Sequence, residues 1–220
     1  MAVALIVAAG RGERLGSSRP KALVPLAGRP MLHWSIEVLR GVGTVSEIVV
    51  ALPAGELGAA PPGVRAVEGG EVRSRSVLAA LGAASEDDGP VLVHDAARPL
   101  ATAELFHRAL DELERSGADA VVTAVPVSDT LKLADPSGET VERTLDRSRL
   151  WAVQTPQAFR REALESALRD ASEDELRSAT DDAWLIEHAG GSVRIVPGDP
   201  RNIKITTATD LRVAEVLLAS

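Results

Sequence analysis

The stretch VALIVAAGRGERLG, from Val3 to Gly16, decides the fold class of this chain. It opens with an unbroken run of apolar residues, which is typical of a strand that is buried on both faces of a parallel sheet. Gly10 and Gly12 follow the run at once, and glycines just past a strand let backbone N–H groups come close to an anion. The stretch therefore predicts a buried strand that ends in an anion-binding loop.

The rest of the chain alternates between apolar runs and amphipathic segments. The predicted strands are Val3–Ala8, Glu47–Leu52, Val64–Val67, Val91–His94, Ala120–Val125 and Ser192–Val196. The predicted helices are Pro30–Arg40, Arg73–Ala84, Thr102–Ser116, Arg160–Asp170, Thr180–Ala189 and Thr207–Leu218, the last with a capping box of Thr207 and Asp210. Such alternation implies right-handed crossovers. We expect an α/β fold of three layers, a mostly parallel, Rossmann-like sheet with helices on both faces.

A polar segment from Val127 to Leu150 interrupts this rhythm. The turn signal Asp135-Pro136-Ser137-Gly138 lies between two candidate strands, Thr130–Leu133 and Thr140–Leu145, which predicts a projecting β-hairpin arm at about residues 127–150. A hairpin with so few apolar residues is marginal in water, so the arm either is a mobile flap or packs on a second subunit. We favour the second interpretation. Nothing else divides the chain, and residues 1–220 are expected to form a single domain.

Composition excludes several classes of function. The 220 residues carry 24 Lys and Arg against 32 Asp and Glu, a net charge of −8, which argues against nucleic acid and against an anionic membrane as partners. The chain has no cysteine, and its four histidines show no close ligand spacing. The run from Ala2 to Ala9 is too short to span a bilayer, so a cytoplasmic protein is expected.

The glycine loop carries two cations, Arg14 and Lys21. The loop is no dinucleotide fingerprint, because that pattern would need a glycine where Leu15 stands, and it is no Walker A loop. A triphosphate that is attacked at its α-phosphorus gathers negative charge, which fixed cations stabilise. Either cation alone would usually be a solvated surface side chain. Together on a glycine loop after a buried strand, they predict a phosphate site.

Three further segments contain candidate site residues. Gly69 to Ser76 precede a predicted helix, where Ser74 or Ser76 would either contact a base or simply cap the helix; the residues do not separate these interpretations. Asp95 ends a buried strand, where ligands of open α/β sheets bind, and it would hold Mg²⁺ or substrate hydroxyls, or else pair with Arg98. Lys204 lies between two isoleucines, and because a buried lone ammonium is costly, we expect an anion beside it.

Taken in order, the motifs resemble one known family. They are AAGxGxR with the later Pro-Lys, VHDAARP at 93–99, Asp129-Thr130-Leu131-Lys132, Asp146-Arg147, QTPQ at 154–157, TDD at 180–182 and NIKIT at 202–206. The first motif, AAGxGxR with the later Pro-Lys, is typical only of a broad nucleotidyltransferase fold. The whole set of motifs is similar to that of the 2-C-methyl-D-erythritol 4-phosphate cytidylyltransferases of the non-mevalonate isoprenoid pathway. The resemblance runs from Ala2 to the last predicted helix.

The resemblance implies transfer of CMP from CTP to methylerythritol phosphate, with release of pyrophosphate and with Mg²⁺ accompanying CTP. It implies that Arg14 and Lys21 stabilise the transition state and that Arg147 and Lys204 position the acceptor phosphate. The implied nucleotide-binding residues are Ala8, Ala9, Gly10, Gly12, Gly70, Glu71, Ser76 and Ala96. The implied acceptor-binding residues are Asp95, Thr130, Arg147, Thr155 and Thr180. It further implies a homodimer formed through the arm, with Arg147 entering the partner's site; protein ligands of the metal are not predicted.

The chain departs from the family's usual residues at Val7 (proline), at Ala22-Leu23 (Gln-Tyr) and at Glu71 (aspartate), and the last departure affects the expected fit around the base. Other functions stay open at this point. They are a ribitol 5-phosphate cytidylyltransferase, another sugar-nucleotide pyrophosphorylase, and a non-catalytic nucleotide-binding subunit. The cations Arg14, Lys21 and Lys204 speak against the non-catalytic subunit, and the residue Leu15 speaks against a nicotinamide-dependent oxidoreductase.

Overall fold

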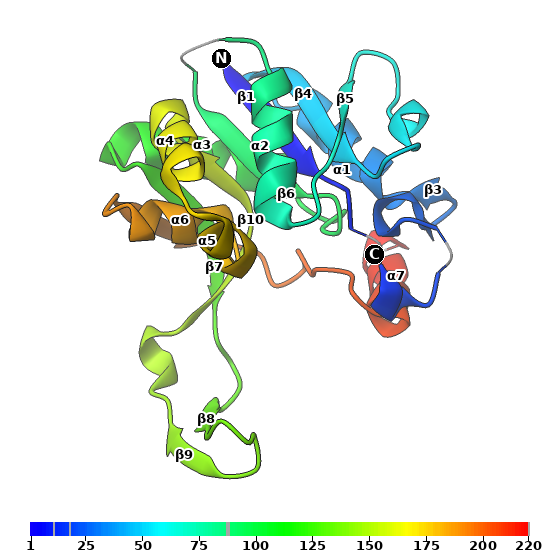
Figure 1. The fold of residues 1–220 in the computed structure, drawn as a ribbon. Coiled ribbons are helices and arrows are strands. Elements are labelled where there is room, and N and C mark those ends of the chain that lie inside the picture. The colour runs from blue at the N-terminus through cyan, green and yellow to red at the C-terminus, as the bar shows by residue number, and fades with distance from the viewer. Residues whose placement is uncertain (11, 18, 87–88, 220) are drawn as a thin grey trace.

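The computed structural model of the chain describes residues 1–10, 12–17, 19–86 and 89–219, and it contains a seven-stranded sheet in the order β11-β7-β10-β6-β1-β4-β5 (Figure 1). The strands are β1 (Ala2–Val7), β4 (Val45–Leu52), β5 (Arg65–Glu68), β6 (Val91–Asp95), β7 (Ala120–Pro126), β10 (Trp151–Phe159) and β11 (Val193–Pro197). All neighbours pair in parallel except β10, which is antiparallel to both β6 and β7. The predicted mostly parallel sheet is confirmed.

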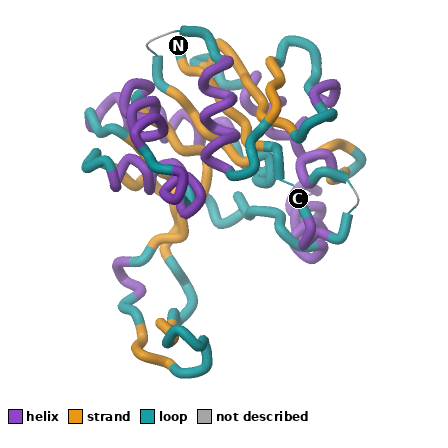
Figure 2. The backbone as a smooth tube through the Cα atoms, in the orientation of Figure 1, coloured by secondary structure: helices purple, strands orange, loops and turns teal. Residues whose placement is uncertain are grey.

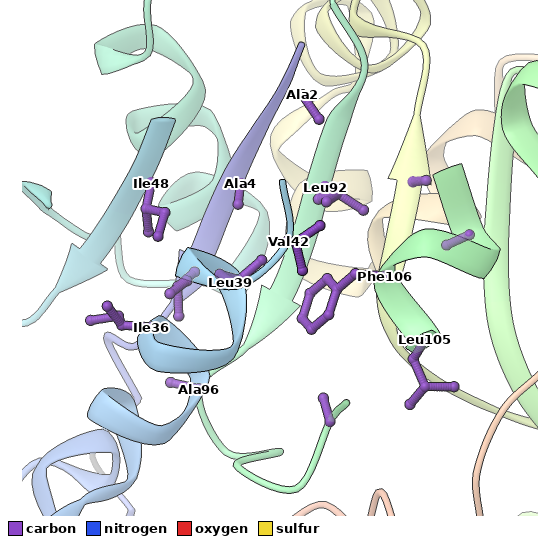
Figure 3. Packing of buried hydrophobic residues seen from close by; sticks show 14 of the residues in the cluster. Ala2, Ala4, Ile36, Leu39, Val42, Ile48, Leu92, Ala96, Leu105 and Phe106 are labelled. Carbon is purple, nitrogen blue, oxygen red and sulfur yellow. The ribbon is translucent and has the colours of Figure 1, made fainter. Parts of the chain in front are cut away.

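Helices cover both faces of the sheet because the side chains of each inner strand alternate between two apolar clusters. Ala4 and Ile6 of β1 pack toward α1 (Met31–Arg40) and α3 (Ala103–Ser116), and Figure 3 shows part of this cluster around Leu39 and Phe106. The alternate residues of β1 pack on the other face. The helices there are α2 (Arg73–Ala83), α4 (Arg161–Asp170), α5 (Glu173–Ser178) and α6 (Asp182–His188). The predicted three-layer fold is confirmed.

The last helix, α7 (Ala208–Ala219), returns to the N-terminal loop. A third apolar cluster joins Ala214 of α7 to Leu15, Leu26 and Met31, next to the small hairpin of β2 (Pro25–Leu26) and β3 (Arg29–Pro30) (Figure 1). Asp210, in the first turn of the helix, accepts from the backbone N–H groups of Thr206 and Thr207, and its own N–H donates to Thr207 Oγ1, as the predicted capping box requires. The last helix thus packs against the segment that follows the first glycine loop.

The predicted hairpin arm is confirmed. Strands β8 (Lys132–Ala134) and β9 (Val141–Thr144) form a separate antiparallel sheet on a segment that extends away from the main sheet (Figure 2). The turn between them contains Gly138, whose φ of 77° lies in the left-handed region that favours glycine. Leu133 and Val141 are exposed on the arm, so in one chain its apolar side chains have little to pack against.

Strand β10 and helix α5 were not predicted, and neither were the two-residue strands β2 and β3. Strand β10 has a polar centre, Gln154 to Gln157, and therefore lacks the apolar run by which the other strands were found. Helix α5 is short, although Ser172 and Glu175 form a capping box at its start, which is a readable signal. No helix in the described part of the chain is both long and apolar enough to cross a membrane.

Candidate active site

A cavity of about 660 Å³ opens where β1 and β6 end. This is the edge of an open α/β sheet at which ligands bind. Loops that follow β1, β5 and β6 supply most of its lining, and the segment before α7 closes the remaining side. The lining residues are Val7, Ala8, Ala9, Gly10, Gly12, Arg14, Lys21, Ala22, Gly70, Glu71, Val72, Arg73, Ser76, Asp95, Ala96, Ala97, Lys204 and Thr206.

The glycine loop folds back on itself and places Lys21 beside its glycines. The Lys21 N–H donates to Gly10 O at 3.1 Å. Gly12 has a φ of 73°, and a Cβ added there would lie 2.7 Å from the Cβ of Lys21, so the close approach requires glycine. Arg14 is exposed on the short helix Glu13–Leu15 and also faces the cavity. The loop therefore presents two cations to one space.

Burial and neighbouring cations lower the pKa of Lys21 to about 8. Burial makes the largest contribution, and the positive charges of Lys204 and Arg14 add to it against the opposing carboxylates of Asp95 and Asp210. The cations are thus close enough to repel one another when no ligand is present. A polyanion in the cavity would relieve this repulsion and favour the charged form of Lys21.

We expect Lys21→Met to raise the free energy of unfolding at pH 7 by about 1–2 kcal/mol, after allowance for solvent screening. The pKa of Lys21 lies below its ordinary value of 10.5, so its charged form destabilises the fold below pH 8. That cost falls as the pH rises from about 8 to 10.5, because the folded chain then releases a proton that the unfolded chain retains. Urea unfolding at pH 7 and pH 10 measures the difference.

The control is Arg108→Met, which removes a half-buried cation from α3 that does not line the cavity. Arginine stays charged over this pH range, so its removal should change stability equally at both values. If the stability difference between Lys21→Met and the unmodified chain is the same at pH 7 and pH 10, then the charged form of Lys21 does not destabilise the fold.

Lys204 faces the same cavity from the other end of the chain. Its Nζ lies 2.6 Å from Asp95 Oδ2, so the expected anion is present and is a carboxylate of the protein. The N–H of Ile205 donates to Ala97 O at 2.8 Å, which fixes the segment against the loop that follows β6. The flanking isoleucines had suggested a buried ammonium, and this expectation is wrong. Ile205 packs in the α7 cluster, whereas the side chain of Lys204 is 42% exposed.

Asp95 is held ionised by cations on both sides. Burial alone would raise the pKa of this carboxyl group, but Arg73 and Lys204 outweigh burial and keep it far below its usual value. Arg73 Nε donates to Oδ1 at 3.1 Å, while Lys204 contacts Oδ2. The expected alternative, a brace between Asp95 and Arg98, is wrong, because Arg98 donates to the backbone carbonyls of Asn202 and Val153.

The second glycine loop approaches the first. A Cβ added at Gly69 would lie 2.4 Å from the Cβ of Ala9, so glycine is needed where the loops meet. Ser76 lies in the first turn of α2, and its Oγ accepts from the N–H of Gly70 at 3.1 Å, while α2 has no side-chain cap. The alternative that Ser76 caps the helix is therefore wrong, because this hydroxyl holds the shape of the loop. Glu71 is exposed and lies 3.5 Å from Arg177 of α5.

The structure brings most of the predicted site residues together. All eight predicted nucleotide-binding residues line the cavity, as do Arg14, Lys21, Asp95 and Lys204. The other four predicted residues lie outside the cavity that the described residues form. Thr130 and Arg147 are exposed on the arm, where Arg147 donates to Ser128 O, and Thr180 is exposed just before α6.

Thr155 lies behind Asp95. It is buried, and its Oγ1 accepts from the N–H of Asp95 at 3.0 Å and lies 3.1 Å from Nδ1 of His94. Burial lowers the pKa of His94 to about 4, so the ring is neutral, and it packs edge-on against Phe106 at 5.1 Å between centroids. His94 therefore packs in the core behind Asp95.

Arg73 is the charged lining residue that the sequence did not reveal. It begins α2, and it contacts Asp95 through Nε and Asp182 through Nη1. An arginine in the first turn of a helix, shortly after Gly69 and Gly70, was the available signal, but nothing in the sequence showed that two distant carboxylates converge on it.

The chain was compared with known protein families, sequences and structures, and the three comparisons agree. A family model described as 2-C-methyl-D-erythritol 4-phosphate cytidylyltransferase (IspD) matches residues 2–220. A protein of that description from Saccharopolyspora erythraea is 46% identical and covers 99% of both chains. One from Nocardia farcinica is 48% identical over 98% of this chain and 93% of its own. A crystal structure of a Thermus thermophilus protein of that description aligns with a TM-score of 0.81, at 36% identity over 98% of both chains.

Proposed function

The chain belongs to the 2-C-methyl-D-erythritol 4-phosphate cytidylyltransferase family, and on that basis we propose how its own side chains carry out the reaction. The enzyme transfers CMP from CTP to 2-C-methyl-D-erythritol 4-phosphate, which yields 4-diphosphocytidyl-2-C-methyl-D-erythritol and pyrophosphate. One observation carries the assignment of roles. Cations from the first and last parts of the chain, Lys21 and Lys204, line one cavity beside a glycine loop.

We propose that the two glycine loops bind CTP. The loop of Ala8, Ala9, Gly10 and Gly12 would hold the triphosphate on backbone N–H groups, as glycines past a buried strand can. The loop of Gly70, Glu71 and Ser76 would contact the cytosine, and Ala96 would pack under the ribose. The proximity of the two loops at Gly69 and Ala9 supports a single ligand that lies across both.

Arg14 and Lys21 would stabilise the charge that gathers at the α-phosphate in the transition state. The acceptor's phosphate oxygen is ionised at neutral pH and needs no general base, so positioning and charge stabilisation are the main tasks of the protein. Lys204 and Arg147 would hold the acceptor phosphate in line with the bond to pyrophosphate. The repulsion among Lys21, Lys204 and Arg14 supports this proposal, because cations that repel one another across a cavity are suited to bind two phosphorylated substrates.

We propose that Mg²⁺ enters with CTP. In the part of the chain that the structure describes, no three His, Asp or Glu side chains gather into a group that could hold a metal ion. Both oxygens of Asp95 already contact cations. These residues fit a Mg²⁺ held mainly by the triphosphate, a common arrangement for this ion, where it would neutralise phosphate charge.

We further propose that residues 1–220 form a single nucleotidyltransferase domain and that the arm of residues 127–150 joins two copies into a homodimer. Exposed apolar side chains on and beside the arm, Leu131, Leu133, Val141, Trp151 and Val153, support a partner surface there. Thr130 and Arg147 lie on the same arm and are not among the residues that line the cavity of their own chain. They would complete the acceptor site of the partner, together with that chain's Asp95, Thr155 and Thr180.

A panel of substrates tests the function. We expect pyrophosphate release when CTP, Mg²⁺ and 2-C-methyl-D-erythritol 4-phosphate are supplied together. We expect kcat/KM to be at least about 100-fold lower when ribitol 5-phosphate replaces this acceptor, or when UTP or GTP replaces CTP. The reason is that a polar site rejects a ligand that leaves its hydrogen-bonding groups unpaired. Faster turnover with ribitol 5-phosphate would contradict the assignment of the acceptor. Equal turnover with UTP would contradict the proposed contacts of the second glycine loop.

A further inference from the structure

The guanidinium of Arg73 joins three elements at the floor of the cavity. It begins α2, its Nε donates to Asp95 Oδ1 at the end of β6 at 3.1 Å, and its Nη1 donates to Asp182 Oδ2 at the start of α6. Asp182 is fully buried. In chain order these groups are far apart, yet one side chain connects them directly beneath the proposed acceptor site.

Asp182 is fixed for this contact by its neighbour in the sequence. The side chain of Asp181 caps α6 by accepting from the N–H of Trp184 at 3.0 Å, and it also accepts from Gln157 Nε2 at 2.8 Å. The helix start is thereby tied to β10, and Asp182 is aimed at α2. Removal of either Asp95 or Asp182 would leave Arg73 with only one anion at a buried position.

The two oxygens of Asp95 have different partners. Oδ1 contacts Arg73, and Oδ2 contacts Lys204. Lys204 is half exposed on the wall of the cavity and has room to turn toward an incoming phosphate, whereas Arg73 is anchored from behind by Asp182. When a substrate phosphate attracts Lys204, Oδ2 becomes available to accept a hydroxyl group, and Arg73 is the cation that stays.

We propose that Arg73 is a positioning residue that keeps the Asp95 carboxylate oriented toward the hydroxyl groups of the polyol phosphate after Lys204 has moved to the phosphate, with Asp182 as its anchor. The inference rests on the proposed role of Asp95 in the acceptor site. It assigns Arg73 no contact with the nucleotide, so its removal should affect the acceptor and not CTP.

The electrostatics agree with the geometry. The positive charge of Arg73 contributes most among the nearby charges that hold the pKa of Asp95 below its usual value, and Lys204 contributes through both its charge and a hydrogen bond. Asp182 behaves differently, because burial raises its pKa despite the same guanidinium. Arg73 thus favours the charged form of both carboxylates, of which only Asp95 lines the cavity. Within the described residues, Arg73 Nη2 and Asp182 Oδ1 have no hydrogen-bond partner among the protein's own groups.

Steady-state kinetics of pyrophosphate release with the full chain, Mg²⁺ and both substrates test the proposal. For Arg73→Lys we expect a KM for 2-C-methyl-D-erythritol 4-phosphate that is raised about 10- to 100-fold, with the KM for CTP changed less than about threefold, because a point charge replaces a two-sided fork. Asp182→Asn, which loosens the anchor but keeps the arginine, should raise the same KM to a smaller extent. Arg161→Met removes a mostly buried arginine that pairs with Glu165 on α4, and it should change neither KM.

A double substitution separates positioning from a merely structural role. In an Asp95→Asn background, Arg73→Lys should change the acceptor KM less than about threefold, because the group that it orients is already lost. An acceptor KM that rises equally with and without Asp95, or a parallel rise in both KM values, would overturn the proposal. If the unmodified chain turns over CTP only with a different acceptor, the proposed function fails first, and this outcome is visible in the same assay before any variant is compared.

Discussion

Replacing Lys21 with alanine is expected to lower kcat for pyrophosphate release roughly 10²- to 10³-fold, which corresponds to about 2–4 kcal/mol of lost transition-state stabilisation by analogy with oxyanion donors. Gly12 allows the Cβ of Lys21 to approach the loop closely, and Lys21 lines the cavity at the end where we propose that the triphosphate binds. The loss should fall on kcat more than on the KM for CTP, because the charge that Lys21 stabilises is greatest in the transition state.

The matched control is Arg108→Ala on α3, a half-buried cation that pairs with Glu104 and does not line the cavity. Its kcat should equal that of the unmodified chain. A Lys21→Ala variant that folds normally and keeps its full rate would show that the glycine loop binds phosphate without taking part in catalysis.

The second large effect concerns the arm. Arg147→Ala alone should lower kcat/KM by about 10- to 150-fold, the loss expected when a charge-assisted contact to phosphate is removed. Because Arg147 lies on the arm and outside the described lining of its own cavity, we expect it to serve the partner's site. Dimers assembled from an Arg147→Ala chain and a Lys21→Ala chain should then regain activity, since one site of each mixed dimer has both side chains.

Random assembly of such a symmetric dimer gives about half mixed dimers with one intact site each, which predicts about a quarter of the unmodified activity. The two variants are unfolded together and refolded, and each variant refolded alone serves as the control. If the mixture is no more active than the average of the two controls, Arg147 acts within its own chain or the chains do not pair through the arm.

The sheet could be predicted where strands are buried on both faces. The predicted strands Val3–Ala8 and Val91–His94 agree with the bounds of β1 and β6 to within about one residue. A short continuous apolar run in an α/β chain is typical of a buried strand. Strand β10 could not be found in the same way. Its centre is held by polar contacts, such as Thr123 Oγ1 donating to Pro156 O at 2.9 Å, and these contacts exist only once β7 and β10 are paired.

Site residues that are close in the sequence could likewise be predicted together, whereas those that only the fold brings together could not. Gly10, Gly12 and Lys21 belong to one loop, so their spacing alone predicted a common anion site, and the structure brings them together. Arg73 was missed because its partners, Asp95 and Asp182, are 22 and 109 residues away in the chain, and only the packing of α2 against β6 and α6 makes them neighbours. The resemblance supplied the role of Lys204, and the placement of α7 explains why a residue so late in the chain reaches the first loop.

The central claim is that Lys21 and Lys204, from opposite ends of the chain, act on the same pair of phosphates. A double-mutant cycle of Lys21→Ala and Lys204→Ala, measured as kcat/KM for pyrophosphate release, tests this most directly. We predict a coupling of at least about 1 kcal/mol, with the double variant less impaired than the product of the single losses, because groups that act as a unit are not additive. Losses that multiply to within about 0.5 kcal/mol would contradict the claim, since they would place the two ammonium groups at independent sites.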